Sequence, residues 1–172
     1  MFGPWQAPDR VIPRLICRAL HGQELQVSAG VVRDFLFVED AVTAIELVLE
    51  RDHWGATYNV ASGVGIGLYA LAQMIIEAVG HGGAIIERES STTMYRNPSL
   101  VLSSEKISRE LGWRPVVSLC SGIQKTSDWY KAHSRWWSKH NTEVSAEVGG
   151  KAFLIDRIVA DAPTADCGQE GD

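Results

Sequence analysis

Apolar residues recur along the chain at a spacing of three and four positions in several separate stretches, and this spacing predicts helices. The predicted helices lie around Leu15–Leu20, Val42–Leu49, Leu68–Val79, Ser104–Leu111 and Ser118–Trp137. Gly22, Gly80 and Gly112 follow three of them and predict their ends. Pro13 suits the first turn of the first helix. Asp40 precedes the second helix and is expected to be its N-cap.

Short runs of apolar residues between these helices predict strands. The predicted strands are Leu25–Val27, Phe35–Val38, Ala56–Ala61 and Ala84–Glu87. Between the last two, three glycines of the segment 63–67 predict a flexible turn. Because strands and helices alternate, the pattern favours an α/β fold. A chain of 172 residues with 45% hydrophobic residues is long enough for one domain with its own core.

Charge divides the chain into two parts. The formal net charge is −5, which argues against non-specific electrostatic binding of nucleic acid. Residues 139–172 include seven acidic and three basic residues, so most of the excess negative charge lies there. We therefore expect a folded part at 1–138 and a partly disordered acidic tail at 139–172. No apolar run is long enough to span a membrane, and the first residues lack the features of a signal peptide.

Candidate nucleophiles and metal ligands are sparse. Cys17, Cys120 and Cys167 are far apart, and no Cys/His spacing suggests zinc. An odd number of dispersed cysteines fits the reducing cytoplasm better than a disulfide framework. The five histidines are scattered, and we expect them to be solvated.

A glycine pattern imitates a dinucleotide-binding turn. Gly65-x-Gly67-x-x-Ala70 opens a predicted helix, and Glu87 follows 20 residues after Gly67. The alternative is an ordinary glycine-rich turn. We favour the ordinary turn, because little sheet-forming sequence remains downstream to complete a dinucleotide-binding domain.

Three arginines in three predicted loops suggest a different ligand. Arg10, Arg33 and Arg96 can each hold a phosphate by bidentate, charge-assisted contacts. If the loops converge, they form a diphosphate site. The alternative is that they are surface arginines, with Arg33 paired to Asp34.

Five sequence blocks in order then resemble a known family. They read FGPWQAPDRVIPRLI, RDFLFVEDAVTAIELVLE, ATYNVASG, SSEKISRELGWRP and SDWY. Together they are similar to the C-terminal part of the extended short-chain dehydrogenase/reductases, the NAD-dependent nucleotide-sugar epimerases and 4,6-dehydratases. The resemblance covers roughly residues 2–131. It implies a C-terminal substrate-binding lobe plus the last strand and helix elements of a Rossmann-type fold, without the N-terminal NAD-binding part.

The resemblance also implies what the chain lacks. In the intact family, NAD is the cofactor, and a Tyr-x-x-x-Lys pair serves the hydride transfer. Here no glycine-rich NAD loop of the family type occurs, and the four tyrosines are followed four positions later by Ser62, Gln73, Ser99 and Ser134. We therefore expect no catalytic residue and no cofactor site in this chain alone.

The family's substrate pocket can be carried over in part. The substrate-binding positions that the resemblance implies are Arg10, Val11, Gln26, Ser28, Arg33 and Arg96. Arg33 matches the arginine that grips the nucleotide diphosphate, while Arg10 and Arg96 match phosphate contacts more loosely. Gln26 and Ser28 flank the base, and the family often has an aromatic residue where Ser28 stands. Val64 stands where the dehydratase branch can place an asparagine.

Three functions remain open at this point. The first is nucleotide-sugar binding as the C-terminal portion of an NAD-dependent epimerase or dehydratase. The second is a non-catalytic sensor, or a subunit that complements a separate NAD-binding half. The third is a truncated gene product.

Overall fold

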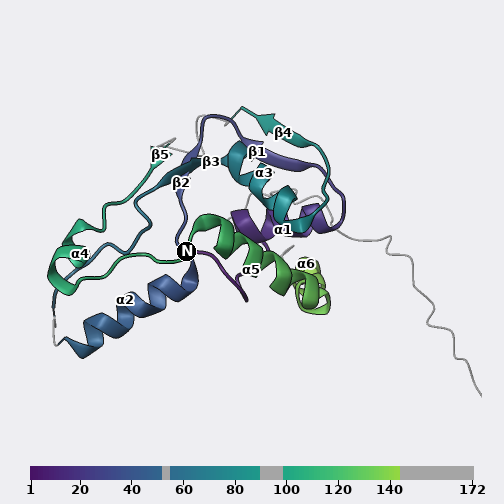
Figure 1. The fold of residues 1–172 in the computed structure, drawn as a ribbon. Helices are drawn as coiled ribbons and strands as arrows, with labels where there is room; N and C mark the ends of the chain where they lie inside the picture. The colour runs from purple at the N-terminus through teal and green to yellow at the C-terminus, as the bar shows by residue number, and fades with distance from the viewer. Residues whose placement is uncertain (52–54, 90–98, 144–172) are drawn as a thin grey trace, which may run out of the picture.

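The computed structural model describes residues 1–51, 55–89 and 99–143. Its elements are α1 (Val11–Leu20), β1 (Leu25–Ser28), β2 (Val32–Asp34), α2 (Val38–Glu50), β3 (Gly65–Gly67), α3 (Leu68–Val79), β4 (Ile85–Arg88), β5 (Ser99–Leu100), α4 (Glu105–Leu111), α5 (Leu119–Ala132) and α6 (Ser134–Glu143). In Figure 1, α2 and α4 lie together on one side of the molecule, away from α1, α3 and α5.

The main core forms around the parallel pair β1 and β4. Leu25 and Val27 of β1 point into this core, where they meet the apolar faces of α1 and α3. Helix α5 covers α1 and α3, and it contributes the fully buried Tyr130. The apolar periodicity of α1 and α3 thus predicted their buried faces correctly. Gly80 ends α3 in the left-handed conformation, as expected of a C-terminal glycine.

A second, smaller core lies under α2 and α4. Ala41 and Ala44 of α2 pack there against Ile107 and Leu111 of α4 and against Trp113. In Figure 1, the three-stranded sheet β3-β2-β5 lies between α4 and α3. Its central strand β2 is antiparallel to β3 and parallel to β5.

Three predictions for the strands were wrong. The strand of this region is Val32–Asp34 rather than Phe35–Val38, where Phe37 forms only a single bridge with Phe2 before α2 begins. The segment 56–61 forms no strand, because no neighbouring strand pairs with it in the part of the chain that the structure describes. The glycine segment is not a free turn, since Gly65–Gly67 pairs with β2.

Two helix predictions also need correction. Asp40 is not the N-cap of α2, because the helix begins two residues earlier with Phe37 at the N-cap position. The last predicted helix is divided at His133 into α5 and α6. There the indole N–H of Trp137 donates to the carbonyl oxygen of Tyr130 at 2.9 Å, so a side chain replaces a backbone donor at the break.

The predicted boundary between the folded part and the acidic tail falls inside α6. This helix runs from Ser134 to Glu143, across the predicted boundary between 138 and 139. The remainder of the predicted tail, residues 144–172, lies outside the described residues. Over the described ranges, none of the helices has the length and apolar character needed to cross a membrane.

Candidate functional site

Arg33 lies at the centre of the three-stranded sheet. It faces Ile66 of β3 and Leu100 of β5 across the strand register. Its Nη1 donates to the carbonyl oxygen of Val32 at 2.7 Å. Its side chain is partly exposed, so a ligand can reach the guanidinium from solvent.

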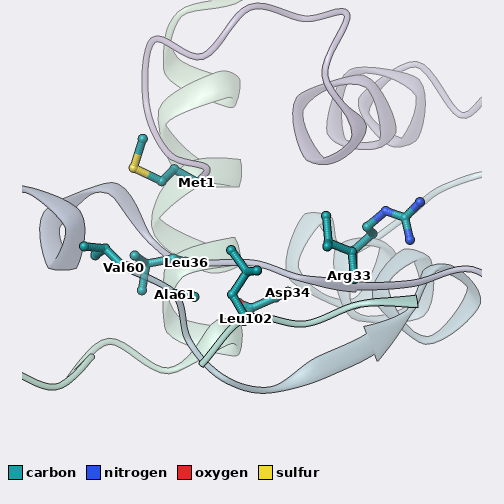
Figure 2. A pocket seen from close by; sticks show the side chains of 8 residues that line it. Met1, Arg33, Asp34, Leu36, Val60, Ala61 and Leu102 are labelled. Carbon is teal, nitrogen blue, oxygen red and sulfur yellow. The ribbon is translucent and has the colours of Figure 1, made fainter. Parts of the chain in front are cut away.

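A shallow depression of about 120 Å³ adjoins Arg33. Its lining residues are Met1, Arg33, Asp34, Leu36, Val60, Ala61, Leu100 and Leu102. Figure 2 shows the guanidinium pointing away from the apolar side chains of Leu36, Val60 and Leu102. Because pockets that bury a small organic ligand hold about 300–1,000 Å³, this depression can enclose only part of a nucleotide sugar.

Asp34 does not pair with Arg33, although the two residues are adjacent. Its Oδ1 accepts hydrogen bonds from the backbone N–H of Ser62 at 3.0 Å and from the hydroxyl of Ser62 at 2.7 Å. Its Oδ2 accepts from the backbone N–H of Gly63 at 2.9 Å. The carboxylate therefore fixes the turn that follows the pocket residues Val60 and Ala61. The sequence offered a signal for this role, since a Ser-Gly turn presents successive backbone donors.

We expect Asp34→Ala to lower the free energy of unfolding by about 2 kcal/mol, because three partly exposed hydrogen bonds to a carboxylate are lost together. Ser62→Ala is the matched control: it removes the hydroxyl contact to Asp34 and the two longer exposed contacts to the backbone of Val64, but it keeps both backbone donors to the carboxylate, and it should cost about 1 kcal/mol. Urea unfolding followed by tryptophan fluorescence gives both values. Equal losses in the two variants would contradict the role assigned to Asp34.

Four of the other predicted site residues lie on β1 or at the start of α1. Gln26 and Ser28 alternate with buried residues on β1, so both face away from the core. Arg10 is the N-cap residue of α1 and forms an exposed ion pair with Asp9, with 3.8 Å between Nε and Oδ1. Val11 begins α1 and packs against the core. Arg96 lies outside the described residues.

The segment Gly65-x-Gly67 does not fit the pyrophosphate of a dinucleotide. A dinucleotide fingerprint needs a turn between a parallel strand and its helix, whereas β3 is antiparallel to β2 and runs directly into α3. A Cβ atom on Gly65 would lie 2.7 Å from a methyl carbon of Val32 and 2.7 Å from one of Val101. Close packing within the protein therefore accounts for this glycine, and we derive no step through NAD from these residues.

The two described cysteines offer no activated thiolate next to Arg33. Cys17 is fully buried in α1, and burial raises the pKa of its thiol to about 12. Cys120 is exposed at the start of α5 and does not line the depression beside Arg33. Within the described ranges, no group of three or more His, Cys, Asp or Glu side chains is placed to hold a metal ion.

Comparison with known proteins places this geometry in a family. The profile of the family described as GDP-mannose 4,6 dehydratase matches residues 2–126. A dTDP-glucose 4,6-dehydratase from Salmonella typhimurium is 32% identical over 146 residues, which is 78% of this chain and 40% of that protein. The chain therefore belongs to the GDP-mannose 4,6 dehydratase family, within the extended short-chain dehydrogenase/reductases.

Solved structures agree with this assignment. The dTDP-glucose 4,6-dehydratase from Bacillus anthracis, solved in complex with NAD, superposes with a TM-score of 0.70 at 27% identity and covers 81% of this chain and 44% of that one. The UDP-glucose 4-epimerase from Thermotoga maritima, solved with UDP-glucose, gives 0.66 at 25% identity and covers 76% and 43%. The predicted α/β class and its Rossmann-type relatives are thus confirmed. The chain spans about 40% of the length of these relatives.

Proposed function

We propose that this chain provides the nucleotide-sugar-binding part of an NAD-dependent epimerase or dehydratase. The family match over residues 2–126, together with Arg33 at the edge of a partly open depression, supports this proposal most directly. In this account, Arg33 binds the diphosphate by charge-assisted hydrogen bonds. Gln26 and Ser28 adjoin the base, and Arg10, Val11 and Arg96 complete the phosphate end.

The chemistry of the sugar belongs to the remaining part of the family fold. The chain has no Tyr-x-x-x-Lys pair, so it lacks the acid/base pair that the family uses for hydride transfer. The small depression beside Arg33 agrees with this assignment, because a whole nucleotide sugar needs more surrounding residues than the depression provides. An NAD-binding part would supply the remaining pocket residues and the catalytic pair.

Thermal unfolding in the presence of ligands tests this proposal. A ligand at about 100 times its dissociation constant adds roughly 2.7 kcal/mol to the stability of the folded state. We expect dTDP-glucose or UDP-glucose to raise the unfolding temperature of the purified chain, and NAD to leave it unchanged. A rise with NAD alone would contradict the proposal.

A second candidate function, that of a complementing subunit, is favoured by the outer face of α2. Val42, Ile45 and Leu49 lie on one face of this helix and are 46%, 59% and 59% exposed. The opposite face already packs in the smaller core. An exposed apolar helix face of this kind suits an interface with a separate NAD-binding half.

We expect Ile45→Glu to prevent this chain from co-purifying with the NAD-binding part of a dTDP-glucose 4,6-dehydratase produced as a separate chain. A charge on the apolar face would have to be buried in the complex. Val116→Glu is the matched control, because Val116 is also exposed but lies outside α2. Failure of the unmodified chain to co-purify, or equal retention of both variants, would contradict the complementing role.

A further inference from the structure

The outer face of the β1–β4 pair gathers polar side chains at one edge. The parallel register places Gln26 beside Ile86 and Ser28 beside Arg88. Side chains alternate along a strand, and Leu25 and Val27 fill the core face of β1. Gln26, Ser28 and Arg88 therefore share the opposite face.

This edge is where α/β proteins commonly bind ligands. Ser28 and Arg88 are the last residues of two parallel strands, and ligands of open α/β sheets bind outside the carboxyl ends of the strands. The backbone N–H of Ala29 donates to the carbonyl oxygen of Arg88 at 2.9 Å, so the two strand ends are held together. Only residues 29–31 separate β1 from β2, which carries Arg33 (Figure 1).

The chemistry of this face suits a nucleobase. The amide of Gln26 can both donate and accept, as the edge of a base requires. Neighbouring strands lie about 4.8 Å apart, so the small side chain of Ser28 leaves space beside Arg88. A guanidinium is planar and stacks on aromatic rings. Arg88 is exposed, and no ion pair or side-chain hydrogen bond joins it to another described residue.

We propose that Arg88 stacks its guanidinium on the base of the bound nucleotide, in the space that Ser28 leaves open. Arg88 is then a further binding residue that contacts the base of the nucleotide, and Arg33 remains the contact to the diphosphate. This inference rests on the proposed function, because it needs a nucleotide at the carboxyl edge of β1 and β4.

Calorimetric titration of the full chain with dTDP-glucose and with inorganic pyrophosphate tests the assignment. We expect Arg88→Ala to weaken dTDP-glucose binding about tenfold, an ordinary effect for one lost base-stacking contact. Pyrophosphate binding should not change, since pyrophosphate has no base. Arg88→Lys should bind dTDP-glucose as weakly as Arg88→Ala, because lysine keeps the positive charge but has no planar group that can stack on a base. Arg33→Ala should weaken the binding of both ligands.

A rescue variant separates stacking from a general effect on the fold. Ser28→Tyr introduced into Arg88→Ala supplies a ring on the same face, and we expect it to restore most of the affinity for dTDP-glucose. Equal weakening of dTDP-glucose and pyrophosphate by Arg88→Ala would identify a phosphate contact and overturn the inference. Unchanged binding in Arg88→Ala would overturn it as well. Absence of dTDP-glucose and UDP-glucose binding in the unmodified chain would overturn the proposed function and this inference together.

Discussion

Asp40→Ala is expected to lower the free energy of unfolding by about 3–5 kcal/mol, the largest effect on stability that we predict. The Asp40 side chain is buried in the first turn of α2, with only 1% of the residue exposed. Its Oδ1 accepts from the backbone N–H of Val116 at 3.0 Å, and its Oδ2 accepts from that of Val117 at 3.1 Å. Alanine would leave both donors without this partner. Since whole domains are stable by only about 5–15 kcal/mol, this loss is a large part of the stability of the fold.

Asp40 also contacts the connection between the two cores through its backbone. The carbonyl oxygen of Asp40 accepts from the indole N–H of Trp113 at 3.0 Å, so the same residue holds the segment 113–117 at both ends. Chemical unfolding followed by tryptophan fluorescence measures the loss. Asp128→Ala is the control, because Asp128 forms an exposed pair with Lys131 and should contribute less than about 1 kcal/mol. Equal losses for Asp40→Ala and Asp128→Ala would contradict this account of the fold.

Arg33→Ala is expected to weaken nucleotide-sugar binding about 100-fold, the largest effect on binding that we predict. A bidentate guanidinium–diphosphate contact contains two charge-assisted hydrogen bonds, and because Arg33 is partly exposed, each should contribute about 1.5 kcal/mol, so that the pair corresponds to a factor of about 100. The Nη1 of Arg33 also donates to the carbonyl oxygen of Val32, so urea unfolding of Arg33→Ala accompanies the titration to establish that the variant is folded. Calorimetric titration with dTDP-glucose measures the affinity.

Two further variants make the Arg33 result specific. Arg33→Lys keeps the charge but loses the planar fork, so its affinity should lie between those of the alanine variant and the unmodified chain. Arg109→Ala removes an exposed arginine of α4 that pairs with Glu110 at 3.6 Å, and it should bind as the unmodified chain does. If Arg33→Ala and Arg109→Ala bind dTDP-glucose equally well, Arg33 is not the diphosphate contact.

Helices with an apolar face and a glycine end could be predicted from the sequence because their determinants are local. Helix α3 follows its periodicity from Leu68 to Val79 and ends at Gly80. Helix α4 likewise ends at Leu111, before Gly112 in the left-handed conformation. The division at His133 was not predictable in this way. At the division, the indole N–H of Trp137 donates to the carbonyl oxygen of Tyr130, and the rings of Trp129 and His133 stack with centroids 4.4 Å apart. The spacing of apolar residues does not report such contacts.

Strands were harder to predict, because a strand depends on its neighbours. The segment 56–61 has the composition of a strand but finds no partner among the described residues. Conversely, Gly65–Gly67 has the composition of a turn and forms a strand, because β2 lies beside it. For the same reason, the sequence could suggest a pair between Arg33 and Asp34 but could not show that Asp34 binds the distant residues Ser62 and Gly63.

We propose above all that this chain binds a nucleotide sugar through Arg33, without NAD. Isothermal titration of the purified chain with dTDP-glucose, UDP-glucose and NAD in parallel tests it most directly. The account predicts saturable one-to-one binding of at least one nucleotide sugar, lost or strongly weakened in Arg33→Ala, and no binding of NAD. Saturable binding of NAD with no binding of either nucleotide sugar would contradict it.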